Sequence, residues 1–151
     1  VPNRGTVDLA VEIASLAEFY EAWVEEKGIH LTCSGGGLVL GDRLMLRRAV
    51  GNLLSNAVRH TPEKGMITVC VADADNTCIV VSVENTGETI APEHLPRLFD
   101  RFYRVDPSRQ RFGEGAGLGL AITRSIASAH GGDVRVRSEN GITAFEIWLP
   151  A

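Results

Sequence analysis

The sequence predicts one α+β domain, a two-layer α/β sandwich in which a mixed, mostly antiparallel sheet is covered on one face by three main helices. Its 151 residues fit a single domain. Three segments carry apolar residues at helical spacing. The β-rich runs between them come in adjacent pairs, as the strands of hairpins do. We find no repeat and no second domain, so residues 1–151 are expected to form one unit.

Each element follows from a local pattern. Gly28 ends the first helix in the usual glycine position, Asp42 is a suitable N-cap for the second, and Pro62 closes it. Residues 102–116 are polar and contain glycine without any apolar period, which favours a long functional or mobile loop. The expected order is strand 7–9, helix 10–27, strands 29–33 and 38–40, helix 43–60, strands 66–72 and 77–84, short helix 92–98, helix 118–130, and strands 133–138 and 143–149.

Composition excludes several classes of protein. A net charge of −4 and a pI of about 5.6 argue against a general nucleic-acid surface, which needs a basic excess. The three cysteines match no metal-ligand spacing and are interpreted as reduced thiols. His30, His94 and His130 have no partners at metal or catalytic spacing and are interpreted as ordinary surface or helix-end residues. No apolar run approaches the roughly 18 residues of a membrane helix.

A polar stripe lies along the second expected helix. Asn52, Asn56 and His60 recur every fourth residue, with Arg59 beside them, so they share one helix face. Asparagine is a mediocre helix former, so two in register call for an explanation. One explanation is a solvated face. The other is a ligand site, because an asparagine oxygen suits Mg²⁺ and Arg59 suits a phosphate.

Three further segments carry candidate chemistry. Asn85 and Gly87 follow a strand. The Asn85 amide can hydrogen-bond to an adenine edge, and Gly87, which has no side chain, lets the ring approach the backbone. The alternative is an ordinary turn. Residues 113–120 place glycines before a helix, which suits phosphate binding or a flexible hinge. This spacing matches neither a Walker loop nor the dinucleotide fingerprint. Phe99 and Phe102 are interpreted as core residues, and Arg104 as a phosphate or surface residue.

The order of these motifs resembles the ATPase domain of bacterial histidine kinases, in the wider group that includes gyrase B, Hsp90 and MutL. Residues 52–60 resemble the N box of that family, residues 85–87 its first glycine box, residues 98–104 its F box, and residues 115–120 its second glycine box. The resemblance implies bound ATP and Mg²⁺, with residues 102–116 as a mobile ATP lid. Asn56 would be the magnesium ligand, and Asn56 and Arg104 would be the catalytic residues. The implied ATP site is Asn52, Asn56, Arg59, His60, Asn85, Gly87, Ile90, Arg104, Gly115, Gly117, Leu118, Gly119, Leu120 and Thr143.

Three positions depart from the family pattern. Asn85 stands where aspartate is usual, which keeps the acceptor oxygen and loses the charge, and Thr89 stands where a second glycine is frequent. Ile142 also replaces a common glycine, which puts the local turn in question. The segment around Asn85, together with residues 99–106, is similar to the heavy-metal-responsive sensor kinases, such as copper and silver sensors.

None of the four histidines is followed by glutamate, as the phosphoacceptor histidine of the family is. The resemblance therefore implies half of an active site, which transfers the γ-phosphoryl group of Mg-ATP to a histidine on a separate dimerisation and phosphoacceptor domain, and then on to a response regulator. It implies a cytoplasmic domain of an inner-membrane kinase, monomeric in isolation and dimeric in the full protein. The alternatives are a nucleotide-binding regulatory module without transfer, and a related ATPase or anti-sigma-factor kinase that modifies serine.

Overall fold

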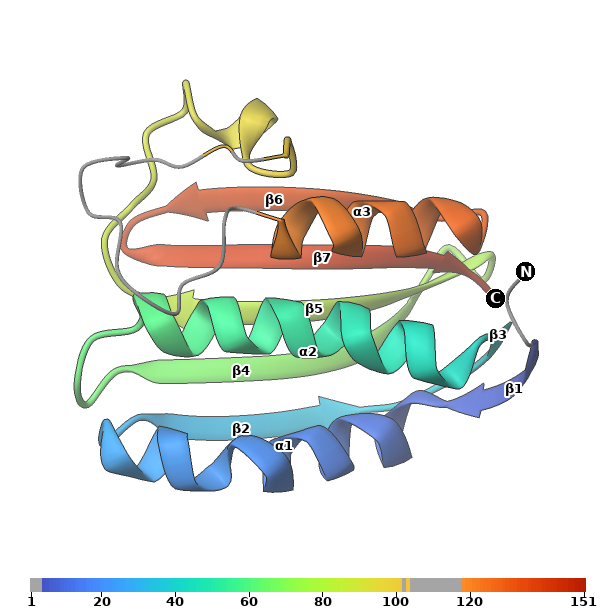
Figure 1. Cartoon of the computed structure of the whole chain (residues 1–151), viewed down its shortest axis with the longest axis horizontal. Helices are drawn as coiled ribbons and strands as arrows, with labels where there is room; N and C mark the ends of the chain where they lie inside the picture. Colours follow the sequence, from blue (N-terminus) through green and yellow to red (C-terminus); the bar gives the residue numbers. More distant parts are fainter. Residues whose placement is uncertain (1–3, 102, 104–117) are drawn as a thin grey trace.

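The computed structural model describes residues 4–101, 103 and 118–151 (Figure 1). The helical segments are α1 (Leu9–Glu26), α2 (Arg43–His60), α3 (Gly119–Ala129) and a 3₁₀ turn, η1 (Leu95–Arg97). The strands are β1 (Gly5–Asp8), β2 (His30–Gly35), β3 (Leu38–Gly41), β4 (Met66–Ala74), β5 (Cys78–Thr86), β6 (Asp133–Glu139) and β7 (Ile142–Pro150).

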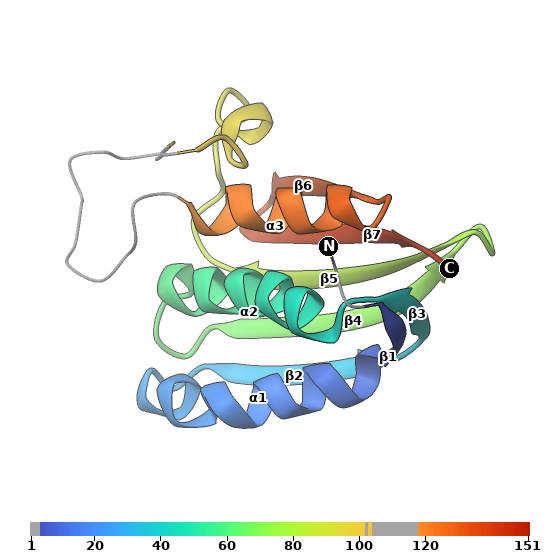
Figure 2. The same ribbon diagram turned by 45° about the vertical axis from the view of Figure 1, so that its right-hand side comes forward.

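Five strands form the main sheet in the order β2-β4-β5-β7-β6. Only β2 and β4 are parallel; β4–β5, β5–β7 and β7–β6 are antiparallel, so the expected mixed, mostly antiparallel sheet is confirmed. β1 and β3 form a separate antiparallel pair at one end of the molecule (Figure 2).

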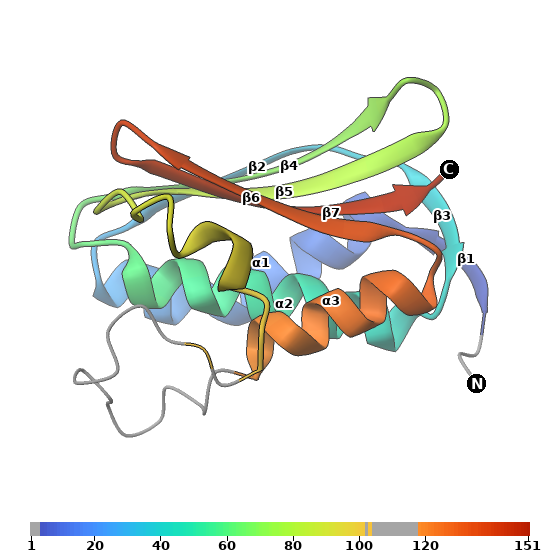
Figure 3. The same ribbon diagram turned by 90° about the horizontal axis from the view of Figure 1, so that it is seen from above.

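The two layers are a sheet and a row of three helices. Figure 3 shows α1, α2 and α3 on the same face of the sheet, as the sequence predicts. Alternate residues of β4 and β5 face these helices, and Ile67, Val69, Val81 and Val83 are at most 1% exposed. The inward face of α2 meets them with Leu53 and Val58, which are fully buried. The core therefore lies between the layers and fixes one face of α2 while leaving its polar face outward.

Hydrogen bonds at the helix starts explain two element boundaries. Asp8 caps α1, because its Oδ1 accepts from the backbone N–H groups of Ala10 (3.1 Å) and Val11 (3.4 Å). Leu9 is therefore helical, which corrects the expected strand 7–9. Asp42 caps α2 as expected, with Oδ1 accepting from Met45 N–H at 3.1 Å.

Turn geometry accounts for two further features. In the β4–β5 hairpin, Asp75 and Asn76 have φ of 55° and 59°. In the β6–β7 hairpin, Asn140 and Gly141 have φ of 53° and 80°, the pattern of a type I′ turn. Ile142 begins β7 directly after this turn. The departure at Ile142 therefore does not disturb the turn.

The expected short helix at residues 92–98 is wrong in extent. Only η1 forms there, and Pro96 lies within it, where proline cannot donate the hydrogen bond that would extend a helix. The expected lid, residues 102–116, lies outside the described residues apart from Tyr103. In the described part of the chain, no helix is both long enough and apolar enough to cross a membrane.

Candidate functional site

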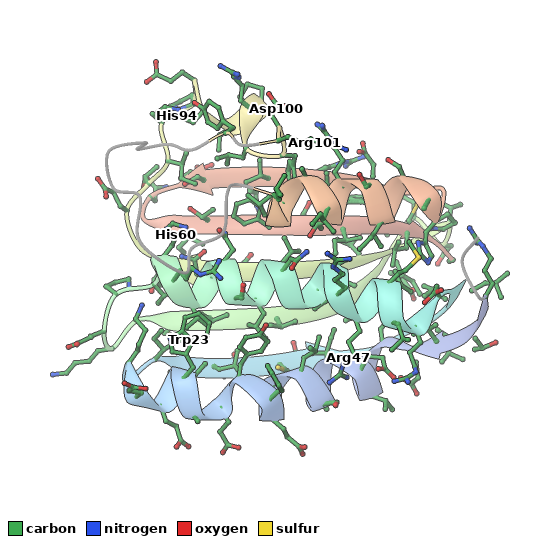
Figure 4. All side chains as sticks on the ribbon, in the orientation of Figure 1. Trp23, Arg47, His60, His94, Asp100 and Arg101 are labelled. Atoms are coloured by element: carbon green, nitrogen blue, oxygen red, sulfur yellow. The ribbon has the colours of Figure 1, made fainter. Side chains whose placement is uncertain are left out.

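The polar stripe of α2 faces the start of α3. Asn52 is half-buried, and its Nδ2 donates to the Gly119 carbonyl at 3.2 Å. Asn56 is half-buried one turn later, while Arg59 and His60 are exposed at the end of the helix. Figure 4 shows His60 at this end of α2. The structure thus brings Asn52 to the glycine segment and leaves Asn56 between that contact and His60.

Strand β5 delivers Asn85 to the same end of the molecule. The Asn85 side chain is 6% exposed, and Thr143, its partner across the β5–β7 ladder, is 5% exposed. Gly87 follows with a φ of 156°, and a Cβ there would lie 3.1 Å from the His60 carbonyl oxygen. A side chain at position 87 would therefore meet the end of α2, so glycine keeps this space open.

The start of α3 supplies the third part of the site. Leu118 and Leu120 are half-buried, and Gly119 between them is exposed. The nearest atoms to a Cβ at Gly119 belong to Asn52, at 3.9 Å. Exposed backbone at the N-terminal end of a helix suits an anion. The predicted site residues Arg104, Gly115 and Gly117 lie outside the described residues.

The segment before residue 102 is attached to both layers. Phe99 is 6% exposed and packs edge-to-face on Phe145 of β7, with ring centroids 5.9 Å apart, so its predicted core role is confirmed. Asp100 lies 3.7 Å from Arg124 of α3. Phe102, the second predicted core residue, lies outside the described part.

The positive charge of Arg59 acts on the neighbouring helix. Burial raises the pKa of the Tyr20 phenol, and the charge of Arg59 opposes that rise. The phenol donates to the Gly51 carbonyl at 3.4 Å, beside a groove between α1 and α2 that reaches Asn52. Figure 4 shows Arg47 along the same pair of helices. The electrostatic influence of Arg59 thus reaches Tyr20 on α1.

The residues present fit a magnesium nucleotide better than a metal held by protein alone. Among the described residues, no group of three His, Cys, Asp or Glu side chains could hold a metal. The half-buried amide of Asn56 is a neutral oxygen ligand. One such ligand suits Mg²⁺, because this ion keeps most of its coordination for water and phosphate oxygens.

The family model for histidine kinase-, DNA gyrase B- and HSP90-like ATPases matches residues 41–151. The chain belongs to this family. The sensor histidine kinase CusS of Escherichia coli strain K12 is 53% identical over 152 aligned residues, which cover 100% of this chain and 32% of CusS. The probable sensor kinase SilS of Salmonella typhimurium is 56% identical over 75% of this chain and 22% of its own length.

Solved structures agree with this family assignment. The catalytic domain of the histidine kinase ThkA superposes with a TM-score of 0.85 at 26% identity, covering 98% of this chain and 97% of that domain. The mycobacterial sensor histidine kinase MprB gives a TM-score of 0.82 at 30% identity, with 97% of each chain covered. The chain thus has the fold of a histidine kinase catalytic domain, and it spans about a third of the length of CusS.

Sequence patterns missed two residues that shape the site. Ser138 of β6 accepts from the Ile90 N–H at 2.8 Å. Thr89 accepts from the Gly141 N–H at 2.7 Å. Both bonds join residues about fifty positions apart, so no local spacing could have revealed them. Thr89, noted only as a departure from the family, thereby ties the loop after β5 to the β6–β7 turn.

Proposed function

We propose that this chain binds Mg-ATP and donates the γ-phosphoryl group to a histidine on a separate phosphoacceptor domain of a heavy-metal-responsive two-component system. One observation carries the proposal. Asn52 of α2 donates to the Gly119 carbonyl at the start of α3, and a Cβ at Gly87, two residues after Asn85, would lie 3.1 Å from the His60 carbonyl at the end of α2. The identities with CusS and SilS support the heavy-metal assignment.

Each part of the site has a distinct task in this proposal. Asn85 and Thr143, both buried in the sheet, hold the adenine edge. Gly87 lets the ring approach the backbone, and Ile90 packs beside it. Arg59 contributes positive charge, and His60 lies against the nucleotide. Asn52 and the backbone of residues 118–120 lie on the phosphate side.

Asn56 is the protein ligand for magnesium in this proposal. Mg²⁺, when bound, neutralises charge on the β- and γ-phosphates. Transfer breaks the bond between the γ-phosphorus and the bridging oxygen of ADP and forms a phosphorus–nitrogen bond on the acceptor imidazole. The domain contributes positioning and electrostatic stabilisation, while the acceptor nitrogen comes from another domain. Arg104 is assigned to the terminal phosphate on the family resemblance.

The partners follow from the same proposal. They are a dimerisation and phosphoacceptor domain of the same kinase and a downstream response regulator. The similarity to full-length ShkA, solved in complex with AMPPNP, supports the nucleotide and the attached domains: its TM-score is 0.83 at 31% identity, over 100% of this chain and 32% of ShkA. We propose a cytoplasmic domain of a membrane-anchored kinase, monomeric alone and dimeric in the full protein.

A transfer assay tests the activity. The chain is mixed with Mg-ATP labelled on the γ-phosphate and with the phosphoacceptor domain of the parent kinase. We expect acid-labile label on that domain, because phosphohistidine hydrolyses in acid, and we expect Asn56→Ala to abolish it. ATP binding without any label on an associated acceptor domain would favour the regulatory-module alternative. Acid-stable label on serine would favour the serine-kinase alternative.

A further inference from the structure

Three hydrogen bonds attach the loop after β5 to the β6–β7 hairpin. The Gly87 N–H donates to the Gly141 carbonyl at 2.9 Å, and the Gly141 N–H donates to Thr89 Oγ1 at 2.7 Å. The Ile90 N–H donates to Ser138 Oγ at 2.8 Å. The loop that borders Asn85 is therefore held by β6 and β7 and not by its own segment alone.

Ser138 extends this attachment to Thr143. Their hydroxyl oxygens lie 2.7 Å apart, and the two residues are partners in the β6–β7 ladder. A hydroxyl carries one proton and two acceptor sites. Either hydroxyl can be the donor in this contact, because the Ile90 N–H occupies only one of the two acceptor sites of Ser138. When Ser138 donates to Thr143, the Thr143 proton is left for another acceptor.

The amide of Asn85 has a defined orientation beside Thr143. Its Nδ2 donates to the Thr86 carbonyl at 3.1 Å, so Oδ1 is the atom left to accept from a ligand. Asn85 and Thr143 are ladder partners and are both nearly buried. Asn85 thus offers a ligand an acceptor. Thr143 offers it a donor when Ser138 donates to Thr143.

We propose that Ser138 is a positioning residue that sets selectivity for the substituent at position 6 of the purine. The inference rests on the proposed function. The chain of donation runs from Ile90 N–H to Ser138 and from Ser138 to Thr143, so that the Thr143 proton faces the purine N1. A hydroxyl that accepts a hydrogen bond is polarised by it and becomes a stronger donor to the next group.

The donor and acceptor pattern matches adenine. Its 6-amino group donates to Asn85 Oδ1, and its N1 accepts from Thr143. Hypoxanthine presents the reverse pattern, a 6-oxo acceptor and an N1–H donor, and so mismatches both groups. An amide at position 85 carries no charge to reject a 6-oxo group, so the hydroxyl chain through Ser138 carries a large share of the discrimination.

The test is calorimetric titration of the chain with Mg-ATP and with Mg-ITP, which differ only in the purine ring. We expect the wild type to prefer ATP by about 100-fold, the effect of two mismatched hydrogen bonds. Ser138→Ala is expected to reduce the preference for ATP over ITP to about tenfold, mainly by weakening the binding of Mg-ATP. Ser138→Cys, which keeps the shape with a weak donor, should behave in the same way.

Two variants act as controls. Ser138→Thr keeps the hydroxyl and should restore the wild-type ratio. Ser82→Ala removes a half-buried serine from β5 at a position whose side chain lies on the other face of the sheet from Asn85, and should change neither affinity. If Ser138→Ala has the same ratio of ATP to ITP affinity as the wild type, including the case in which both nucleotides lose affinity equally, the inference is overturned while the proposed function stands. A wild type that binds neither nucleotide would remove the proposed function as well.

Discussion

His130 is predicted to hold the ends of α2 and α3 together. It is 5% exposed, and its two ring nitrogens have different partners. Nε2 accepts from the Asp42 N–H at 3.0 Å, at the start of α2. Nδ1 therefore carries the proton and donates to the Ile126 carbonyl at 2.8 Å, near the end of α3. Gly41 packs against the ring, because a Cβ there would lie 2.7 Å from Cδ2.

Replacing His130 with alanine removes both hydrogen bonds and the packing of the ring. Losing the partner of a largely buried donor costs about 1–3 kcal/mol, and the space left by the ring adds to that. We expect the free energy of unfolding to fall by about 3 kcal/mol. At about 2–4 °C per kcal/mol for a domain of this size, Tm should fall by roughly 6–12 °C.

His130→Gln is the matched variant. Its side-chain oxygen can still accept from the Asp42 N–H, while the contact with Ile126 is lost, so we expect a loss of about 1 kcal/mol. Urea unfolding followed by circular dichroism measures both variants. The reasoning is refuted if alanine costs less than about 0.5 kcal/mol, the usual range of surface substitutions, or if glutamine is no better than alanine.

Three further predictions concern stability and binding. Burial raises the pKa of the Tyr20 phenol, so the protonated phenol contributes to stability below its unfolded pKa of about 10, and this contribution is lost as pH rises further. Wild type should therefore lose stability relative to Tyr20→Phe above pH 10 in unfolding titrations. A difference in stability that stays constant with pH would contradict this. Gly87→Ala places a Cβ 3.1 Å from the His60 carbonyl at a strained φ, so it should cost about 1–3 kcal/mol in urea unfolding and weaken ATP; wild-type values for both would show that the loop relaxes freely. Asp8→Ala removes the α1 cap and should cost about 1 kcal/mol by the same unfolding measurement, with Asp8→Asn, which can still cap, as the control.

Much of the fold could be predicted because apolar periodicity reports burial directly. The apolar stripe of α2 and the paired β-rich runs of β4 and β5 are both visible in the sequence, and the structure confirms these elements. The boundary at Leu9 was missed because the Asp8 cap decides it, and a short apolar run alone does not. The expected helix at residues 92–98 did not take account of Pro96, which cannot donate the hydrogen bond that would extend it.

The candidate site was predictable only in part. Asn52 and Gly119 belong to separate motifs, and the structure shows that they meet. Ser138 and His130 were not singled out, because their roles come from bonds between residues distant in sequence. His130 was interpreted as an ordinary surface or helix-end residue. Its place at the end of α3 is confirmed, but it is buried and bonded to both helices.

The measurement that tests the central claim most directly is a calorimetric titration of the chain with ATP, in Mg²⁺ and in EDTA. We predict a Kd of about 10 μM with Mg²⁺, roughly −7 kcal/mol. Asn56→Ala should weaken this at least about tenfold, while Ser55→Ala, the neighbouring half-buried residue on α2, should not. In EDTA the difference between wild type and Asn56→Ala should disappear. A folded wild type that binds no ATP at millimolar concentration, or an Asn56→Ala variant that binds Mg-ATP as wild type does, would contradict the account.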